Sequence, residues 1–236
     1  VAATNTQTGL TEGSHCSVCG EVIVAQTIVP VTKSGTCGKN VTWTLDDEGT
    51  LTISGSGAMY DYNFIFEAPW YSYNAEVYKV IISDGITEIG SCAFYHCENL
   101  TNVTIPNGLK TIGECAFGLC SSLTSIYIPN SVTGIGAGAF MYCGLTDISI
   151  SENLTYISQS MFEGCDFSSI VLPNSITGIG KKAFYLCRLT SISIPEGVKS
   201  IGNEAFSICT KLTNITIPTS VKTIGTDAFK LCVALK

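Results

Sequence analysis

The chain has 236 residues and a net charge of −7, with 45% hydrophobic and only 13% charged side chains. This composition excludes disorder for most of the chain, and no run approaches the ~20 consecutive apolar residues that a membrane-spanning helix needs. The acidic balance argues against a nucleic-acid partner, because clustered Lys and Arg supply most of the affinity for a phosphate backbone. Residues 1–180 hold 4 basic and 16 acidic side chains, whereas residues 181–236 hold 8 and 3.

Residues 1–33 are predicted to form a short module or linker around the motif Cys16-Ser-Val-Cys19. Two thiolates on a tight turn suit a tetrahedral soft cation such as zinc. A closed zinc site needs two more ligands, and the only candidates nearby are His15 and Cys37. We therefore expect no metal site here, with a zinc site at Cys16 and Cys19 as the weaker interpretation. A disulfide between these two cysteines and two free thiols are the alternatives.

Residues 34–76 are predicted to form a β-hairpin followed by an aromatic stretch. Alternating apolar residues flank a turn at 46–49, which is typical of a hairpin. The aromatic side chains suit either a sugar- or peptide-binding patch or a cap. A cap is favoured, because the repeats that follow would otherwise leave an apolar end and open strand edges uncovered. The aromatic residues are Tyr60, Tyr62, Phe64, Phe66, Trp70, Tyr71 and Tyr73.

A repeat of 22 or 23 residues fills residues 77–236. Ala-Phe occurs in six copies and Met161-Phe162 in a seventh, and each phenylalanine is followed three residues later by a cysteine. Each unit offers about eight apolar positions that it cannot bury alone, so stacking of the units into a solenoid is predicted. The phenylalanines are Phe94, Phe117, Phe140, Phe162, Phe184, Phe206 and Phe229.

Each unit has the same internal order. Leu-x-x-Ile-x-Ile, as in Leu123–Ile128, predicts a short strand with its isoleucines pointing inward. The proline that follows in most units ends strand pairing, because it has no N–H. A turn and an apolar-x-x-Ile-Gly segment come next, as in 132–136, and we expect the glycine to permit a backbone bend.

The cysteines fall into two groups. Those after the phenylalanines are predicted to be buried, reduced thiols, since ladder side chains point in parallel and a disulfide needs converging Cβ atoms. Cys92 and Cys115 instead lie two residues before a phenylalanine, on adjacent coils, where a disulfide and a pair of exposed thiols are both open. His96 is expected to be a partly buried structural residue.

The repeat L-x-x-I-x-I-P-x-x-V-x-x-I-G-x-x-A-F-x-x-C resembles the BspA-like, or Treponema-type, leucine-rich repeats of bacterial surface proteins. The resemblance covers residues 77–236. It implies a right-handed, β-rich α/β solenoid of about seven coils behind the N-terminal hairpin cap. It also implies an extracellular or cell-surface location and a role in adhesion or host-protein binding.

No catalytic motif appears in the sequence. There is no nucleophile elbow, zinc-protease helix, phosphate loop or dinucleotide fingerprint, and a solenoid core filled by side chains leaves no deep pocket. We therefore predict no enzyme activity and no cofactor. The remaining hypotheses are a recognition module for an extracellular protein or glycan and a structural spacer that presents other domains.

The binding hypothesis rests on the residues that point outward from the strands. They are small and hydroxyl-rich, and Tyr127 is the only large anchor among them. The candidate binding residues are Thr101, Asn102, Thr104, Thr124, Ser125, Tyr127, Thr146, Asp147 and Ser149. The final coil has no polar capping unit after it, so it is predicted to be the loosest coil or to pack end-on against another molecule.

Overall fold

A computed structural model describes residues 9–10, 14–15, 17–19, 22–25, 28–29, 33–62 and 67–236. Two small antiparallel pairs lie in the first 29 residues. They are β1 (Gly9–Leu10) with β4 (Ile28–Val29), and β2 (Ser14–His15) with β3 (Val22–Val24).

The predicted hairpin is confirmed, and it continues directly into the repeats. Strands β5 (Lys33–Gly38), β6 (Val41–Leu45) and β7 (Thr50–Gly55) pair antiparallel. Strand β7 then pairs parallel with β9 (Lys79–Ile82), which pairs parallel with β11 (Asn102–Thr104). The cap therefore covers the edge of the first repeat strand with a strand of its own.

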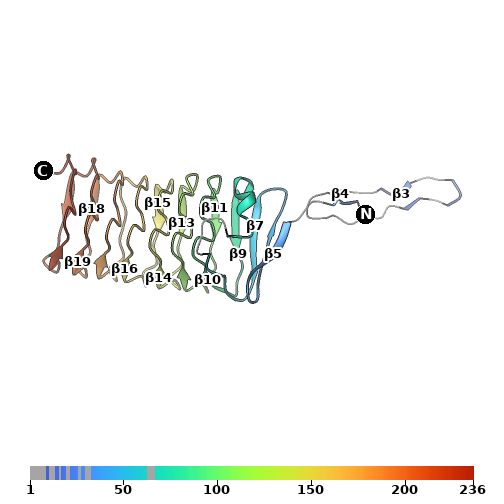
Figure 1. Ribbon diagram of the computed structural model, residues 1–236, viewed down its shortest axis with the longest axis horizontal. Helices are drawn as coiled ribbons and strands as arrows, with labels where there is room; N and C mark the ends of the chain where they lie inside the picture. The colour runs from blue at the N-terminus through green and yellow to red at the C-terminus, as the bar shows by residue number, and fades with distance from the viewer. Residues whose placement is uncertain are drawn as a thin grey trace.

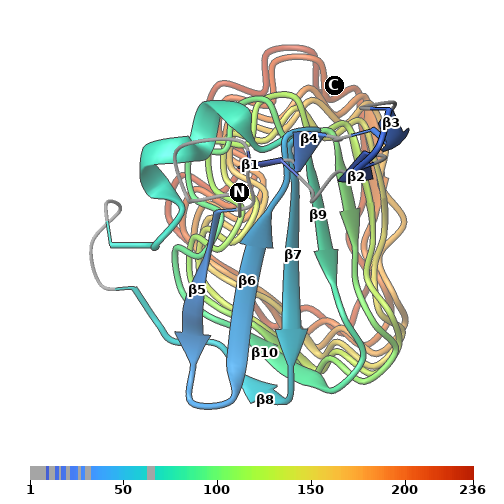
Figure 2. The ribbon, with the colours of Figure 1, turned by 90° about the vertical axis from the view of Figure 1, so that its right-hand side faces the viewer.

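The repeats form a solenoid of parallel strands (Figure 1), and the coils stack in register behind the cap (Figure 2). One face carries β9, β11, β13 (Ser125–Tyr127), β15 (Asp147–Ser149), β18 (Ser191–Ser193) and β20 (Asn214–Thr216). A second face carries β8 (Gly57–Ala58), β10 (Ile86–Ile89), β12 (Thr111–Ile112), β14 (Gly134–Ile135), β16 (Tyr156–Ile157), β17 (Gly178–Ile179), β19 (Ser200–Ile201) and β21 (Thr223–Ile224).

The number of turns is about six rather than the seven expected. Residues 168–171 have the sequence of a repeat strand but carry no strand between β15 and β18. Phe167 stands there where the neighbouring coils have leucine, and its ring packs edge-on against Phe162 at 5.5 Å. The larger side chain of Phe167, directly before this segment, is the main sequence difference that accompanies the loss of the strand.

A column of stacked rings forms the centre of the core. Consecutive phenylalanines from Phe94 to Phe229 lie 5.2 to 6.0 Å apart between ring centroids. Trp70 extends the column into the cap: it is fully buried, stacks on Phe94 at 5.6 Å and donates its Nε1–H to the Ala93 carbonyl at 2.8 Å. The aromatic stretch that was expected to form a cap therefore packs against the first coil through Trp70. Phe64 and Phe66 lie outside the described residues.

The predicted β-rich solenoid is confirmed, and it contains almost no helix. The described residues contain one short 3-10 helix, η1 (Tyr71–Glu76), and the Ala-Phe-x-x-Cys segments form turns. Each such turn holds two residues in the left-handed region, for example Cys92 at φ 53° and His96 at φ 64°. Left-handed residues break an α-helix and are strained for most side chains. The sequence did not predict these left-handed residues, because leucine, isoleucine and lysine occupy the same positions in other coils and rarely adopt a positive φ.

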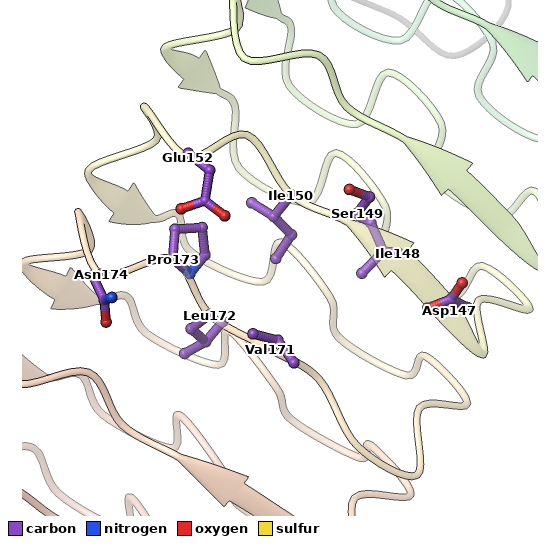
Figure 3. Close-up of a pocket in the computed structure, with 9 residues that line it drawn as sticks. All are labelled: Asp147, Ile148, Ser149, Ile150, Glu152, Val171, Leu172, Pro173 and Asn174. Carbon is purple, nitrogen blue, oxygen red and sulfur yellow. The ribbon is translucent and has the colours of Figure 1, made fainter.

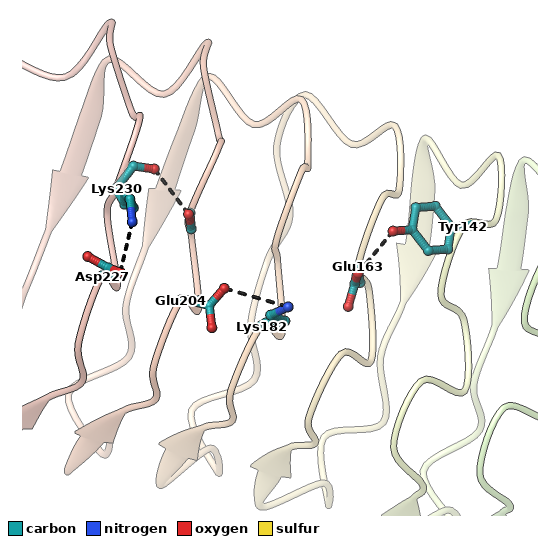
Figure 4. Close-up of polar contacts among 7 residues, drawn as sticks. Tyr142, Glu163, Lys182, Glu204, Asp227 and Lys230 are labelled. Carbon is teal, nitrogen blue, oxygen red and sulfur yellow. Dashed lines mark hydrogen bonds and ion pairs between the residues drawn. The ribbon is translucent and has the colours of Figure 1, made fainter.

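The turns are held by hydrogen bonds from each coil to the next. The N–H groups of Cys92, Phe94 and His96 donate to carbonyls of the following coil at 2.8 Å. Side chains add contacts along this edge, as Figure 4 shows: Tyr142 donates to Glu163 at 2.9 Å, and Lys182 pairs with Glu204 at 3.6 Å. These regular bonds offset the backbone strain in every coil that is followed by another.

The repeated glycine allows close approach rather than a bend. Gly113 and Gly136 have ordinary φ values, but a Cβ at Gly136 would lie 2.5 Å from the backbone nitrogen of Glu114. Ser158 replaces the glycine in one coil, where its hydroxyl donates to the carbonyl of Ile135. The serine therefore adds a side-chain bond to the preceding coil at this position.

The ladder cysteines are buried free thiols, as predicted. Six of the seven donate to the carbonyl of a phenylalanine, as Cys120 does to Phe94 at 3.2 Å and Cys165 to Phe140 at 3.1 Å. The seventh, Cys97, donates to Oδ1 of Asn74 in the cap at 3.6 Å. Burial raises the pKa of the Cys97 thiol to about 12. The Cys97 thiol is therefore a protonated donor at neutral pH.

Candidate functional site

The candidate site is the outer surface of the strand face. All nine candidate residues are exposed there, and the register pairs Ser125 with Asp147 and Tyr127 with Ser149. The threonine before each strand is partly committed to the fold: the hydroxyl of Thr101 donates to the Tyr78 carbonyl at 3.1 Å. Thr146 makes the same bond to the preceding coil at 3.3 Å. These threonines are therefore less available to a ligand than the sequence indicated.

Five of the candidates surround one shallow hollow, which we call the Tyr127 hollow. Its volume is about 320 Å³, and it opens on the strand face where the side chain of Tyr127 is 58% exposed. Thr101, Thr104, Thr124 and Thr146 do not line it. It is lined by Asn102, Val103, Ser125, Ile126, Tyr127, Asp147 and Ser149.

A second depression, the Val171 hollow, lies next to it and was not expected from the sequence. Its volume is about 350 Å³. Figure 3 shows Asp147 at one end and Glu152 with Asn174 at the other, with apolar side chains between them. Val171 is 86% exposed, and it occupies the outward position that Tyr127 and Ser149 hold in the two preceding coils. The hollow is lined by Asp147, Ile148, Ser149, Ile150, Glu152, Val171, Leu172, Pro173 and Asn174.

The Val171 hollow lies at the missing strand. Among the described residues, the backbone N–H groups of Ser169, Ile170, Val171 and Leu172 make no backbone hydrogen bond. A further hollow of about 250 Å³ lies on the other side of this segment, against Ser193 and Pro195. The backbone hydrogen bonds that join neighbouring strands are therefore absent at the segment that lies between the two hollows.

His96 is exposed, with 45% of its side chain accessible to solvent, whereas the sequence led us to expect a partly buried residue. Its Nε2 lies 3.1 Å from a carboxylate oxygen of Glu98. His96, Glu98 and Ser72 line a third, separate hollow of about 320 Å³ beside η1. No hydrogen bond joins Ser72 to His96 in the part of the chain that the structure describes. The cluster therefore lacks the contact that would activate a serine nucleophile.

The other cysteine predictions remain open. Cys16 lies outside the described residues, and Cys19 is exposed. No group of three or more His, Cys, Asp or Glu side chains suited to a metal occurs among the residues with a described placement. Cys92 and Cys115 are free, half-buried thiols, so their disulfide stays a prediction. None of the described helices has the length and apolar character to span a membrane.

The stacked coils, the phenylalanine column and the parallel strands of the two faces define a leucine-rich-repeat solenoid. The sequence model described as BspA type leucine rich repeat region matches residues 67–184 and 133–236, in six copies. These matches cover more than half of the chain, and the chain belongs to this family.

The chain is also similar to several solved structures. A leucine-rich cell surface protein of Faecalibacterium prausnitzii A2-165 is 28% identical, with a TM-score of 0.63 over 86% of this chain and 75% of its own. A leucine-rich-repeat protein of T. pallidum is 28% identical, with a TM-score of 0.49 over 85% and 90%. The pneumococcal vaccine antigen PcpA is 20% identical, with a TM-score of 0.50 over 68% and 50%. A comparison with curated protein sequences finds no match.

Proposed function

We propose that the chain is a non-enzymatic recognition module of a bacterial cell surface or extracellular protein. It binds a protein or glycan through the strand face. The observation that carries the proposal is the Tyr127 hollow, where an exposed aromatic ring stands among small polar side chains. Buried tyrosines are common anchors of protein interfaces, because a large ring loses little conformational entropy on binding.

Two further observations support this proposal. The similar F. prausnitzii protein is described as a cell surface protein. The described histidine cluster has no activated nucleophile, and the interior is filled by the stacked phenylalanine rings. A surface without catalytic groups is suited to binding rather than to chemistry.

A binding screen against extracellular proteins and glycans tests the proposal. Tyr127→Asp should abolish binding to a partner found in the screen. Tyr156→Asp is the matched control, because Tyr156 is 45% exposed on β16 of the other face. Equal loss of binding in both variants, with circular dichroism showing both folded, would place the partner elsewhere than the strand face.

The alternative is a structural spacer that presents other domains. One observation favours it: the hydroxyls of Thr101, Thr146, Thr190 and Thr213 each bond to the preceding coil and so serve the stack. A chain that binds nothing in the screen, although attached domains in the full protein bind or react, would favour the spacer.

A further inference from the structure

The Val171 hollow combines features that point to one class of ligand. We propose that it binds an extended polypeptide segment carrying lysine or arginine side chains about four residues apart. This inference rests on the proposed function, because it names the partner class for the same strand face.

The backbone gives the first step. The N–H groups of Ser169–Leu172 lack backbone partners, whereas the strands on either side, β15 and β18, each pair on their other edge. Unsatisfied backbone groups cost free energy unless water or a ligand meets them. The segment lies between two coils, since Thr190 donates to Ser168 at 2.8 Å, so a ligand can reach it only from the outer surface, through the hollow. The carbonyls of a peptide laid in the hollow would be such a ligand.

The charges give the second step. Asp147 and Glu152 are exposed, and neither forms an ion pair within the described ranges, although five ion pairs occur elsewhere. Asp147 begins β15 and Glu152 lies in the turn after it, five positions along the chain, so the two residues are at most ~17 Å apart. Residues i and i+4 of an extended peptide are ~13 Å apart, and lysine or arginine stems can reach the remaining distance.

The apolar surface between the carboxylates gives the third step. Val171 is 86% exposed and stands between the acidic ends beside Ile148 (Figure 3). In an extended peptide the residue at i+2 faces the same way as i and i+4. A peptide of the pattern basic-x-aliphatic-x-basic therefore matches the hollow in charge and in apolar contact.

The test uses fluorescence anisotropy with the labelled peptide Gly-Lys-Thr-Val-Thr-Lys-Gly and its counterpart with glutamate in place of lysine. The intact chain should bind the lysine peptide, less tightly at high salt because the carboxylates are exposed, and should not bind the glutamate peptide. The double variant Asp147→Asn, Glu152→Gln should weaken binding by about fivefold or more. Val171→Ser should also weaken it.

The matched control is the double variant Asp84→Asn, Glu196→Gln. Asp84 and Glu196 hold the same turn position as Glu152 in other coils and are exposed, but they do not line the hollow. This control should bind as the parent does. Equal loss in both double variants, or no loss in the first, overturns the assignment of the hollow.

The outcome also separates the two proposals. If the lysine peptide does not bind while the screen yields a partner sensitive to Tyr127→Asp, the inference fails and the proposed function stands. If neither the peptide nor any screened partner engages the strand face, both fail.

Discussion

At the scale of single residues, the spacing between coils leaves little freedom at the repeated glycine. A Cβ at Gly136 would lie 2.5 Å from a backbone atom of the preceding coil, and backbone cannot move aside as a flexible side chain can. Gly136→Ala should therefore lower the free energy of unfolding by about 2 kcal/mol, measured by urea denaturation. Gly108→Ala is the control, since no atom lies within 4 Å of a Cβ built there. Similar losses in both variants would show that general flexibility, rather than close approach, matters.

The buried thiols predict a pH dependence of stability. Burial raises the pKa of Cys37, Cys97 and Cys209 to about 12, from an ordinary value of 9.0. Because the folded-state pKa is raised, the stabilisation is complete below pH 9 and is lost as pH rises toward 12. Each thiol should lower the free energy of unfolding by about 1.4 kcal/mol per pH unit in this window.

Urea denaturation between pH 8 and 11 measures this slope. Cys97→Ala should reduce the slope by the contribution of one thiol, about 1.4 kcal/mol per pH unit. It should also lower the free energy of unfolding at pH 7, because the smaller side chain leaves a cavity. A constant free energy of unfolding from pH 9 to pH 11 would contradict the prediction.

At the scale of elements, the cap depends on the contact between Trp70 and the first coil. Trp70→Ala should lower the free energy of unfolding by about 3 to 5 kcal/mol, because it removes a fully buried ring and its hydrogen bond to Ala93. Tyr60→Ala is the control within the same aromatic stretch, since Tyr60 is 52% exposed.

Removal of residues 34–76 should give an aggregating or unfolded product, because it exposes the edge of β9. A fragment 77–236 that is soluble and folds cooperatively would contradict the cap.

The pair Cys92 and Cys115 links two adjacent coils. Both thiols are half-buried, and burial, followed by the charges of neighbouring groups, raises the pKa of Cys92 to about 11. A small-molecule disulfide should oxidise the pair slowly at neutral pH, releasing two small thiols as the protein disulfide forms. Mass spectrometry should then show a loss of two hydrogens in the peptides that contain these cysteines, and none in the ladder cysteines. Complete alkylation of both thiols after oxidation would contradict this.

The sequence predicted most of the core, because repetition makes each inward position visible several times. Leu123, Ile126 and Phe117 are buried as the period requires. The left-handed turns could not be predicted, since Leu186 and Ile208 carry no glycine signal, and the bonds that hold them run between coils. The Val171 hollow was also missed: residues 168–171 keep the repeat pattern, and the coil differs mainly in the larger Phe167 and the apolar Val171.

At the scale of the whole molecule, the turns give the solenoid a direction. In each coil their N–H groups point toward the next coil, so Phe206 and Ile208 donate to the carbonyls of Ala228 and Lys230. The equivalent groups of Phe229 and Leu231 have no backbone partner in the described chain. The side chains of Ile224 and Leu231 are also 50% and 55% exposed. The two ends of the array are therefore different, because the cap covers one and nothing described covers the other.

Hydrogen exchange tests this polarity. In a dilute, monomeric sample of the 236-residue chain, the amides of Phe229 and Leu231 should exchange much faster than those of Phe206 and Ile208. The amide of Gly225 should remain slower than these two, because it donates back to Ile201 at 2.8 Å. If the last coil packs end-on against another molecule, protection of Phe229 should instead rise with protein concentration. Equal protection of Phe229 and Phe206 in a chain shown to be monomeric would contradict both outcomes, since no neighbour would then be present to accept these hydrogen bonds.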